Sequence, residues 1–374
     1  MGRGGSTMYG LRVGKQLAVA AAVYVGLSGV GENAGFQTKK FGGEKVDGEV
    51  CRKVSNICDK SGLSLRIYQY QSCPFPCKVR AFLDYYGFSY EVVEVNPVTK
   101  SQLHFTKDYK KVPIVTNGEL VLKDSSLVIP KLATYLHRPD LNLPDIESLY
   151  PCFEMNRDGK VVSDCPLKYY VIDRSHSEQK LDEVSSGEDV EANLCSLLSP
   201  SQDNIEVVPL TWNCREERVW RQWVDDHFIH LISPNVYRTP KEALETFNWF
   251  SEFGDWKENF TPWNQILAKY VGAFMMYFIA KRLKAKFGLV EDFAEWMEAI
   301  GPDRKFLGGN EPNLVDLAMY GAIVAFSGCS AFREVAANAP IMRWYTAMQQ
   351  AVNAHEGRGL IENRPEMPAN PLPA

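Results

Sequence analysis

The alternation of apolar and polar positions becomes regular at Leu65. Residues 65–70 form a short apolar run of the kind that predicts a β-strand. Apolar side chains then recur at helical spacing before Gly87, which predicts a helix with a glycine C-cap; they are Val79, Phe82, Leu83 and Tyr86. Residues 90–95 alternate again and predict a second strand.

A hairpin and a helix are predicted next. Residues 101–107 are compatible with a short helix, and two apolar runs then flank Asn117-Gly118, a strong signal for a β-hairpin. Asp124 begins an apolar helix that runs to Leu136. The order β-α-β-α-β-β-α over residues 63–140 predicts an α/β domain of the thioredoxin type.

The second half of the chain has a helical pattern. Between residues 215 and 360, apolar side chains recur at helical spacing, as in the face that contains Trp220, Trp223 and Leu231. Residues 271–280 are apolar nearly all round but too few to span a bilayer, which favours a buried central helix. Asn313 and Asp316 have the spacing of a capping box at a helix start.

Three further segments have a different composition. Residues 1–62 are predicted to be a targeting or membrane-anchor segment with a tether, because residues 1–31 carry three basic and no acidic residues and 17–30 are apolar. A secretory signal, an organellar presequence and a disordered leader are the alternatives. Residues 141–214 are predicted to be a linker with a disordered insert, since 177–206 are acidic and serine-rich. Residues 361–374 are predicted to be a disordered tail.

The most informative residue is Cys73, which ends the first strand run and is followed by Pro74. Proline favours the first helical position, so the thiol is placed at a helix N-terminus. There the helix dipole and unpaired N–H groups favour thiolate, which predicts a depressed pKa and a catalytic nucleophile. Cys77 lies four residues on, and Pro76 stands where a dithiol motif has its second cysteine. Two ordinary reduced cysteines and a Cys73–Cys77 disulfide are the alternatives.

Two further positions predict a glutathione site. Val112-Pro113 precedes the hairpin, where thioredoxin-like domains have a cis-proline loop, and its backbone would face an extended peptide. Ser125 follows Asp124 at a helix start, where N–H groups hold a carboxylate. Together they suit the cysteine and the γ-glutamyl carboxylate of glutathione. Plain helix capping is the alternative for Asp124 and Ser125.

Overall composition narrows the class of protein. The formal net charge of −5 gives no reason to expect nucleic acid as a partner. Nine cysteines are too few for a disulfide scaffold in a chain of 374 residues and favour a reducing compartment. No cysteine spacing predicts a zinc site, so no metal is expected.

Several motifs resemble the family of membrane-associated prostaglandin E synthases of type two. The resemblance covers most of the chain from Leu65 to about Tyr345, apart from the insert. The motifs are Cys73-Pro74-Phe75, residues 78–83, 92–97, 109–114, 220–223, 225–226, 230–239, 277–284, 308–309 and 312–314.

This resemblance implies a fold and an activity. The fold would be a thioredoxin-like α/β domain followed by an all-α domain of the glutathione-transferase type. The activity would be thiol-dependent isomerisation of prostaglandin H, a lipid endoperoxide, to prostaglandin E. Cys73 would be the catalytic thiol, and the residues binding glutathione or substrate would be Tyr70, Phe75, Val112, Pro113, Asp124 and Ser125.

The resemblance also implies further partners. A haem–glutathione complex forms in the family under some conditions, and His227 and His230, one helical turn apart, are the candidate haem contacts; the alternative is a role in the core or an interface. A homodimer is a candidate assembly. The N-terminal segment would attach the protein to a membrane, giving an organellar location in the mitochondrion or the Golgi.

One departure from the family bears on the chemistry. The family pattern is Cys-Pro-Phe-Cys-Ser, and here it is Cys-Pro-Phe-Pro-Cys, so the second cysteine is displaced. This displacement argues against dithiol cycling and keeps chemistry through Cys73. Two alternative functions stay open, a glutaredoxin-like oxidoreductase that uses glutathione, and a non-catalytic scaffold that binds haem or glutathione at a membrane.

Overall fold

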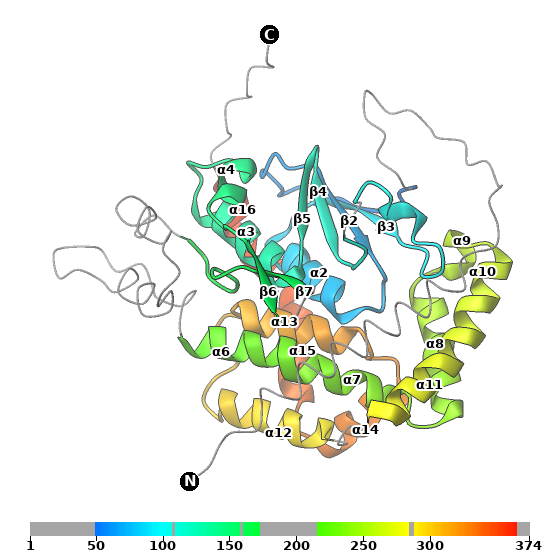
Figure 1. Ribbon diagram of the computed structural model, residues 1–374. Coiled ribbons are helices and arrows are strands. Elements are labelled where there is room, and N and C mark those ends of the chain that lie inside the picture. Colours follow the sequence, from blue (N-terminus) through cyan, green and yellow to red (C-terminus); the bar gives the residue numbers. More distant parts are fainter. Residues whose placement is uncertain (1–48, 107–108, 158–159, 173–214, 284–287, 365–374) are drawn as a thin grey trace.

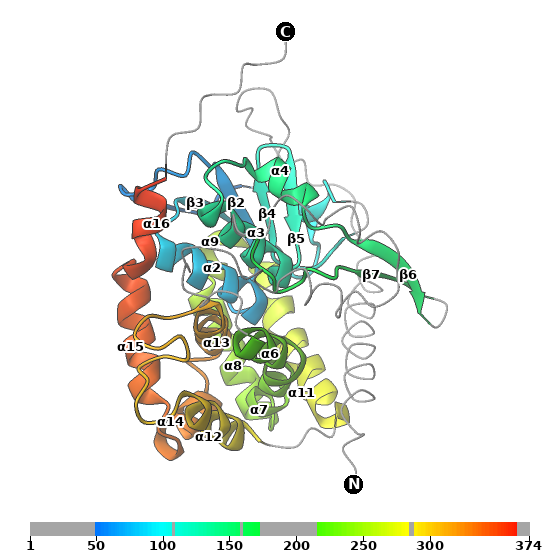
Figure 2. The ribbon, with the colours of Figure 1, turned by 90° about the vertical axis from the view of Figure 1, so that its left-hand side faces the viewer.

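The computed structural model describes residues 49–106, 109–157, 160–172, 215–283 and 288–364 (Figure 1). A β-sheet domain lies above a layer of helices, and α2 and α3 lie between the two (Figures 1 and 2). The predicted fold class is confirmed, with an α/β domain of thioredoxin-like order followed by an all-α domain.

The sheet of the first domain has five strands in the order β1-β3-β2-β4-β5. β2 and β3 are parallel, and the other neighbours are antiparallel. The strands are β1 (Arg52–Val54), β2 (Leu65–Gln69), β3 (Tyr90–Glu94), β4 (Ile114–Asn117) and β5 (Leu120–Lys123). β1 was not predicted, because its three residues are too few to show the alternation of apolar and polar side chains that distinguishes a strand from a loop.

The predicted positions of two helices and the β-hairpin agree with the structure. α2 (Pro74–Tyr86) ends at Gly87, which has a φ of 74° and serves as the predicted C-cap. A two-residue loop joins β4 to β5, and Gly118 supplies its positive φ of 59°. α3 (Ser125–His137) begins after Asp124, as predicted. Between β3 and β4 the structure has only the 3₁₀ turn η1 (Ser101–Leu103).

Residues 143–172 contain regular structure that the sequence pattern did not predict. α4 (Leu143–Ser148) is followed by the antiparallel hairpin β6 (Phe153–Arg157) and β7 (Lys160–Asp164). A disulfide between Cys152 and Cys165 joins the two ends of this hairpin. The acidic stretch 177–206 lies outside the described residues.

The second domain is built from helices of very different length. Two π-helical turns, η5 (Val224–Phe228) and η6 (Leu267–Val271), interrupt otherwise α-helical segments. The other helices are α6 (Arg215–Trp223), α7 (Ile229–Val236), α8 (Pro240–Phe253), α9 (Trp256–Asn259), α10 (Pro262–Ile266), α11 (Gly272–Leu283), α12 (Leu289–Ile300), α13 (Leu314–Val324), α14 (Ser330–Asn338), α15 (Met342–Asn353), η7 (Glu356–Arg358) and α16 (Gly359–Glu362).

The two domains meet where α2 packs directly against α13. Gly321 of α13 makes this approach close, because a Cβ there would lie 2.6 Å from the Cys77 carbonyl oxygen and 2.6 Å from the Lys78 Cα. The predicted capping box of α13 is confirmed, with Asn313 and Asp316 bonding each other's backbone N–H groups. Asp316 also accepts from the Trp344 indole at 2.9 Å, which fixes α13 against α15.

A buried ion pair reinforces this contact between the domains. The Lys78 ammonium of α2 bonds the carboxylate of Asp225 in η5, and both side chains are almost fully buried. The Ser126 hydroxyl of α3 donates to the same carboxylate, and so does the Tyr169 hydroxyl at 2.9 Å. Because three segments donate to this one carboxylate of η5, the orientation of α2 is fixed from several sides.

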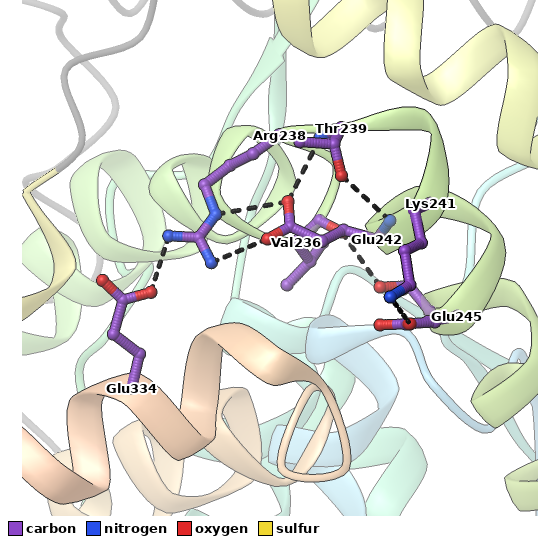
Figure 3. A network of polar contacts seen from close by, with 8 residues as sticks. Val236, Arg238, Thr239, Lys241, Glu242, Glu245 and Glu334 are labelled. Carbon is purple, nitrogen blue, oxygen red and sulfur yellow. Dashed lines mark hydrogen bonds and ion pairs between the residues drawn. The ribbon is translucent and has the colours of Figure 1, made fainter.

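A second polar network joins the start of α8 to α14 (Figure 3). Arg238 donates to Glu242 at 3.0 Å and to Glu334 of α14 at 2.6 Å. Thr239 and Glu242 form a capping box that begins α8. The end of α7 is held to α8 by a hydrogen bond of 2.9 Å from the Thr246 hydroxyl to the Val236 carbonyl.

Two expectations from the sequence are corrected. Residues 271–280 are not a buried central helix, since Phe274 is 61 % exposed and Phe278 is 50 % exposed. Within the parts of the chain that the structure describes, no helix has the length and apolar character needed to cross a bilayer. This finding contradicts the expected membrane-associated, organellar location. Residues 1–48, which suggested it, and residues 365–374 lie outside the described residues.

We expect Gly321→Ala to destabilise the protein, because the added methyl group would meet the α2 backbone. The free energy of unfolding should fall by about 1–3 kcal/mol, the usual cost of overpacking. Gly359→Ala is the control, since nothing lies within 4 Å of a Cβ at that helical position. Denaturant unfolding of both variants checks this, and equal stability of the two would contradict the proposed close contact.

Candidate active site

The thiol of Cys73 lies at the N-terminus of α2, as predicted. Cys73 is the N-cap residue with extended backbone angles (φ −84°, ψ 130°), and Pro74 takes the first helical position. Its N–H donates to the Tyr70 carbonyl at 3.0 Å, and its carbonyl accepts from the Cys77 N–H at 3.1 Å. These two bonds fix the end of β2 and the first turn of α2 around the sulfur.

The expected depressed pKa of Cys73 is corrected. Although part of the residue remains exposed, burial of the sulfur raises its pKa from 9.0 to about 12. A hydrogen bond from the Phe75 N–H and the charge of Arg80 act in the opposite direction and are outweighed. The helix start therefore stabilises the thiolate less than loss of water destabilises it, and Cys73 is a protonated thiol at neutral pH.

Cys77 is a buried thiol within a polar network beneath the site. Its sulfur donates to the Gln71 carbonyl at 3.2 Å and accepts from the Arg80 guanidinium at 3.0 Å. Arg80 also binds the Gln69 side chain at 2.9 Å. Burial raises the pKa of nearby Glu94 to about 7, even though the Gln71 N–H donates to it. Both Cys73 and Cys77 are free cysteines, so the disulfide alternative is not realised.

The proline loop and the residues near the thiol come together. The Val112–Pro113 peptide bond is cis, as expected. Val112 belongs to a small buried cluster with Tyr68 and Ile114, and Cys73 and Tyr70 pack against that cluster. Phe75 packs instead against the main core, where the Lys78 ammonium lies 5.4 Å from its ring centroid.

The Asp124–Ser125 pair begins α3. Asp124 has a positive φ of 66°, its carboxylate accepts from the Ser126 N–H at 3.0 Å, and it forms an ion pair with Lys168 at 3.4 Å. Ser125 is only 1 % exposed, and its hydroxyl has no hydrogen-bond partner among the residues that the structure describes. A buried hydroxyl without a partner costs free energy, so a ligand group that bonds it is stabilised there.

Tyr109 was not predicted as a site residue, although it lies in a motif shared with the family. Its side chain interacts with the backbone and the charge of Asp124 and with the charge of Cys73, so it lies between the two halves of the site. Burial raises the pKa of its hydroxyl to about 12, so the hydroxyl is protonated at neutral pH. Its position three residues before Val112 was the signal in the sequence.

The two histidines proposed as haem contacts both lie near carboxylates. The Nε2 atom of His227 lies 3.1 Å from the Asp292 carboxylate of α12, and this interaction raises the pKa of His227. Its nitrogen is thus already engaged in packing α12. Burial lowers the pKa of His230, which lies near the charges of Asp225 and Asp226. The predicted haem contact is therefore not supported.

Together these residues offer three kinds of group at one place. The protonated thiol of Cys73, the side chain of Tyr109 and the Val112–Pro113 loop lie near one another. A carboxylate and an unpartnered hydroxyl lie at the start of α3. This arrangement can bind an extended peptide with a free amino-acid end and can donate a proton from sulfur to a bound substrate.

The first domain matches a known family model. Residues 67–135 match the family model described as glutathione S-transferase, N-terminal domain. Among solved structures, the apo form of glutathione S-transferase III aligns with 83 % of this chain and 99 % of its own, at 16 % identity and a TM-score of 0.37. At that similarity the comparison has no bearing on chemistry.

Two curated relatives are far more similar in sequence. Prostaglandin E synthase 2 of Danio rerio is 38 % identical over 327 residues, which cover 84 % of this chain and 78 % of that protein. Prostaglandin E synthase 2 of Mus musculus is 36 % identical over 330 residues, covering 85 % and 78 %. The chain therefore belongs to the prostaglandin E synthase 2 family.

Proposed function

We propose that this protein is a glutathione-dependent isomerase that converts prostaglandin H endoperoxide to prostaglandin E, with Cys73 as its catalytic thiol. Membership of the family supports the reaction class. The observation that carries the proposal to this chain is the placement of the Cys73 thiol beside the cis Val112–Pro113 loop. Ser125 adds support, because its buried hydroxyl has no hydrogen-bond partner among the described residues.

The isomerisation leaves the number of electrons in the substrate unchanged. The proton on the carbon beside one peroxide oxygen leaves, and its bonding electrons form the carbonyl as the O–O bond breaks. The other oxygen takes up a proton and becomes a hydroxyl. A thiol with a pKa near 12 suits the second of these events, so Cys73 donates its proton to the departing oxygen. The proton lost from carbon is returned to the sulfur, which closes the cycle.

Glutathione would be held by groups at both ends of the site, and when bound it supplies a second thiol. The Val112 backbone faces the cysteine portion of an extended peptide. Ser125 and the first N–H groups of α3 hold the γ-glutamyl carboxylate, and Asp124 holds its ammonium. Lys168 is then displaced from Asp124, at low cost because that ion pair is largely exposed.

The alternative functions are less well supported. A glutaredoxin-like oxidoreductase needs an exposed thiolate, whereas burial raises the pKa of Cys73 to about 12. A resolving role for Cys77 is disfavoured because its sulfur is buried and bonded to Arg80 and Gln71. A non-catalytic scaffold would bind glutathione equally well but would not depend on Cys73 for turnover.

We expect Cys73→Ser to lower kcat for prostaglandin E formation by about 10²- to 10⁴-fold, because a hydroxyl is a far weaker acid than a thiol. Cys77→Ser is the matched control, since serine can keep the hydrogen bonds to Gln71 and Arg80 and should retain most activity. Product formation from prostaglandin H with glutathione present is the measurement. Equal loss in both variants would exclude a monothiol mechanism.

We expect Ser125→Ala to weaken glutathione binding about 10-fold, the effect of losing about 1.4 kcal/mol from one hydrogen bond to a charged group. The neighbouring Ser126→Ala is the control, because its hydroxyl bonds Asp225 rather than facing the site. Ser126→Ala should lower stability and leave affinity nearly unchanged. Calorimetric titration with glutathione separates the two, and unchanged affinity in Ser125→Ala would contradict the proposed γ-glutamyl site.

A further inference from the structure

A disulfide ties the two ends of the β6–β7 hairpin together. It joins Cys152, which is exposed, to Cys165, which is partly buried. The hairpin forms a two-stranded sheet of its own, separate from the five-stranded sheet, and it projects from the body of the protein (Figure 2). A lone two-stranded hairpin is marginally stable in water, so its order depends strongly on this covalent bond.

A short turn connects the disulfide to an ion pair at the start of α3. The Cys165 carbonyl accepts from the Lys168 N–H at 3.0 Å, and the Lys168 ammonium lies 3.4 Å from the Asp124 carboxylate. We call residues 165–168 the clip. Leu167 is its one residue with a buried side chain. Because Lys168 follows Cys165 so closely and bonds its backbone, the disulfide determines where the ammonium of Lys168 lies.

The residue that follows the clip has a strained backbone. Tyr169 has a φ of 76°, in the left-handed region that residues other than glycine rarely adopt. The Arg221 guanidinium donates to its carbonyl at 2.8 Å, and its hydroxyl donates to Asp225 at 2.9 Å. These bonds hold the far end of the clip in a conformation that costs free energy. The clip is therefore strained at one end and tied by a single covalent bond at the other.

The disulfide can exchange with a small thiol. Exchange requires that a thiolate reach one sulfur, and Cys152 is exposed. A glutathione thiolate attacks the Cys152 sulfur, the S–S bond breaks, and Cys165 leaves as a thiolate that takes up a proton. A second glutathione thiolate then attacks the glutathione sulfur of the mixed disulfide, which releases glutathione disulfide and frees the Cys152 thiol. Two glutathione molecules are oxidised and one protein disulfide is reduced, once per chain rather than once per turnover.

We propose that the Cys152–Cys165 disulfide is a thiol-exchange site that controls access to Asp124. While the disulfide is intact, the clip holds the Lys168 ammonium on the Asp124 carboxylate. Reduction by a small thiol separates the ends of the hairpin, and Lys168 leaves Asp124. The consequence for binding rests on the proposed function, in which Asp124 holds the ammonium of glutathione. Glutathione thus opens part of its own site by reducing the disulfide.

The exchange is tested by incubating the full-length protein with glutathione and trapping the free thiols with iodoacetamide. Peptide mass spectrometry should find a mixed disulfide at Cys152 at early times and alkylated Cys152 and Cys165 later. A phosphine, which reduces disulfides without forming a mixed disulfide, is the control for complete reduction. A bond that the phosphine reduces and glutathione leaves intact would overturn the assignment of an exchange site.

The opening of the clip is tested without any ligand. Brief treatment with acetic anhydride, before and after reduction by the phosphine, reports how exposed each lysine is. Acetylation of Lys168 should rise about 2-fold on reduction, because its side chain is 38 % exposed in the clip and becomes fully exposed when released. Lys241 is the internal control, since its side chain is already 86 % exposed and lies on α8. Its acetylation should not change.

The effect on the site is tested with S-methylglutathione, which has no thiol and cannot reduce the disulfide. Calorimetric titration should show about 2- to 5-fold tighter binding to the reduced protein, the effect of freeing Asp124 from an exposed ion pair. A double variant with Cys152→Ser and Cys165→Ser should bind as the reduced protein does, whether or not the phosphine is present.

A lysine variant assigns the effect to the clip. Lys168→Met should bind S-methylglutathione tightly in both redox states, because it has no ammonium to occupy Asp124. Lys241→Met is the matched control, since it removes another exposed lysine that pairs with a carboxylate, that of Glu245 at 3.8 Å. It should keep the difference between the oxidised and reduced states.

Three outcomes would overturn the proposal. They are equal acetylation of Lys168 in the two redox states, equal affinity of the oxidised and reduced protein for S-methylglutathione, and a redox difference in affinity that persists in Lys168→Met. Failure of the proposed function gives a different result, in which S-methylglutathione binds to neither state. Acetylation of Lys168 then decides by itself whether the clip opens.

Discussion

The close packing of α2 against α13 is the contact on which the rest of the structure depends. Gly321 lets the two helices approach until the α2 backbone occupies the place of a side chain. The buried Lys78–Asp225 pair fixes the same contact electrostatically, and losing one partner of such a pair is costly. Because Cys73 caps the start of α2, this interface between the domains also determines where the Cys73 thiol lies, and burial there shields the sulfur from water.

That shielding explains the chemical character of the site. At an exposed helix start the dipole would favour thiolate, but around Cys73 loss of hydration dominates and the pKa rises. Tyr109 is kept protonated by the same cause. A site with two protonated donors next to the Val112–Pro113 loop is better suited to donating protons than to nucleophilic attack. The displaced second cysteine agrees with this, because Cys77 is engaged by Arg80.

Short-range patterns predicted much of this fold and the placement of its site. The strand, proline and helix around Cys73, the Gly118 turn and the cis bond at Val112–Pro113 all follow from neighbouring residues. The pKa of Cys73 depends on packing by distant segments, which spacing cannot reveal. The helix after Gly272 was wrongly placed in the core, because its apolar residues are compatible with burial by the same chain or exposure on its surface. The interaction of His227 with Asp292 could not be predicted from spacing, because the two residues are remote in sequence.

The stoichiometry of glutathione is the most direct test of the central claim. An isomerase leaves glutathione unchanged, whereas a thiol oxidoreductase acting on the same endoperoxide would form a diol and oxidise two glutathione molecules to one disulfide. Purified protein should be incubated with prostaglandin H and glutathione, and products and glutathione disulfide quantified together. The account predicts prostaglandin E with no glutathione disulfide above the rate without enzyme. One glutathione disulfide per diol formed, or no prostaglandin E, would contradict it.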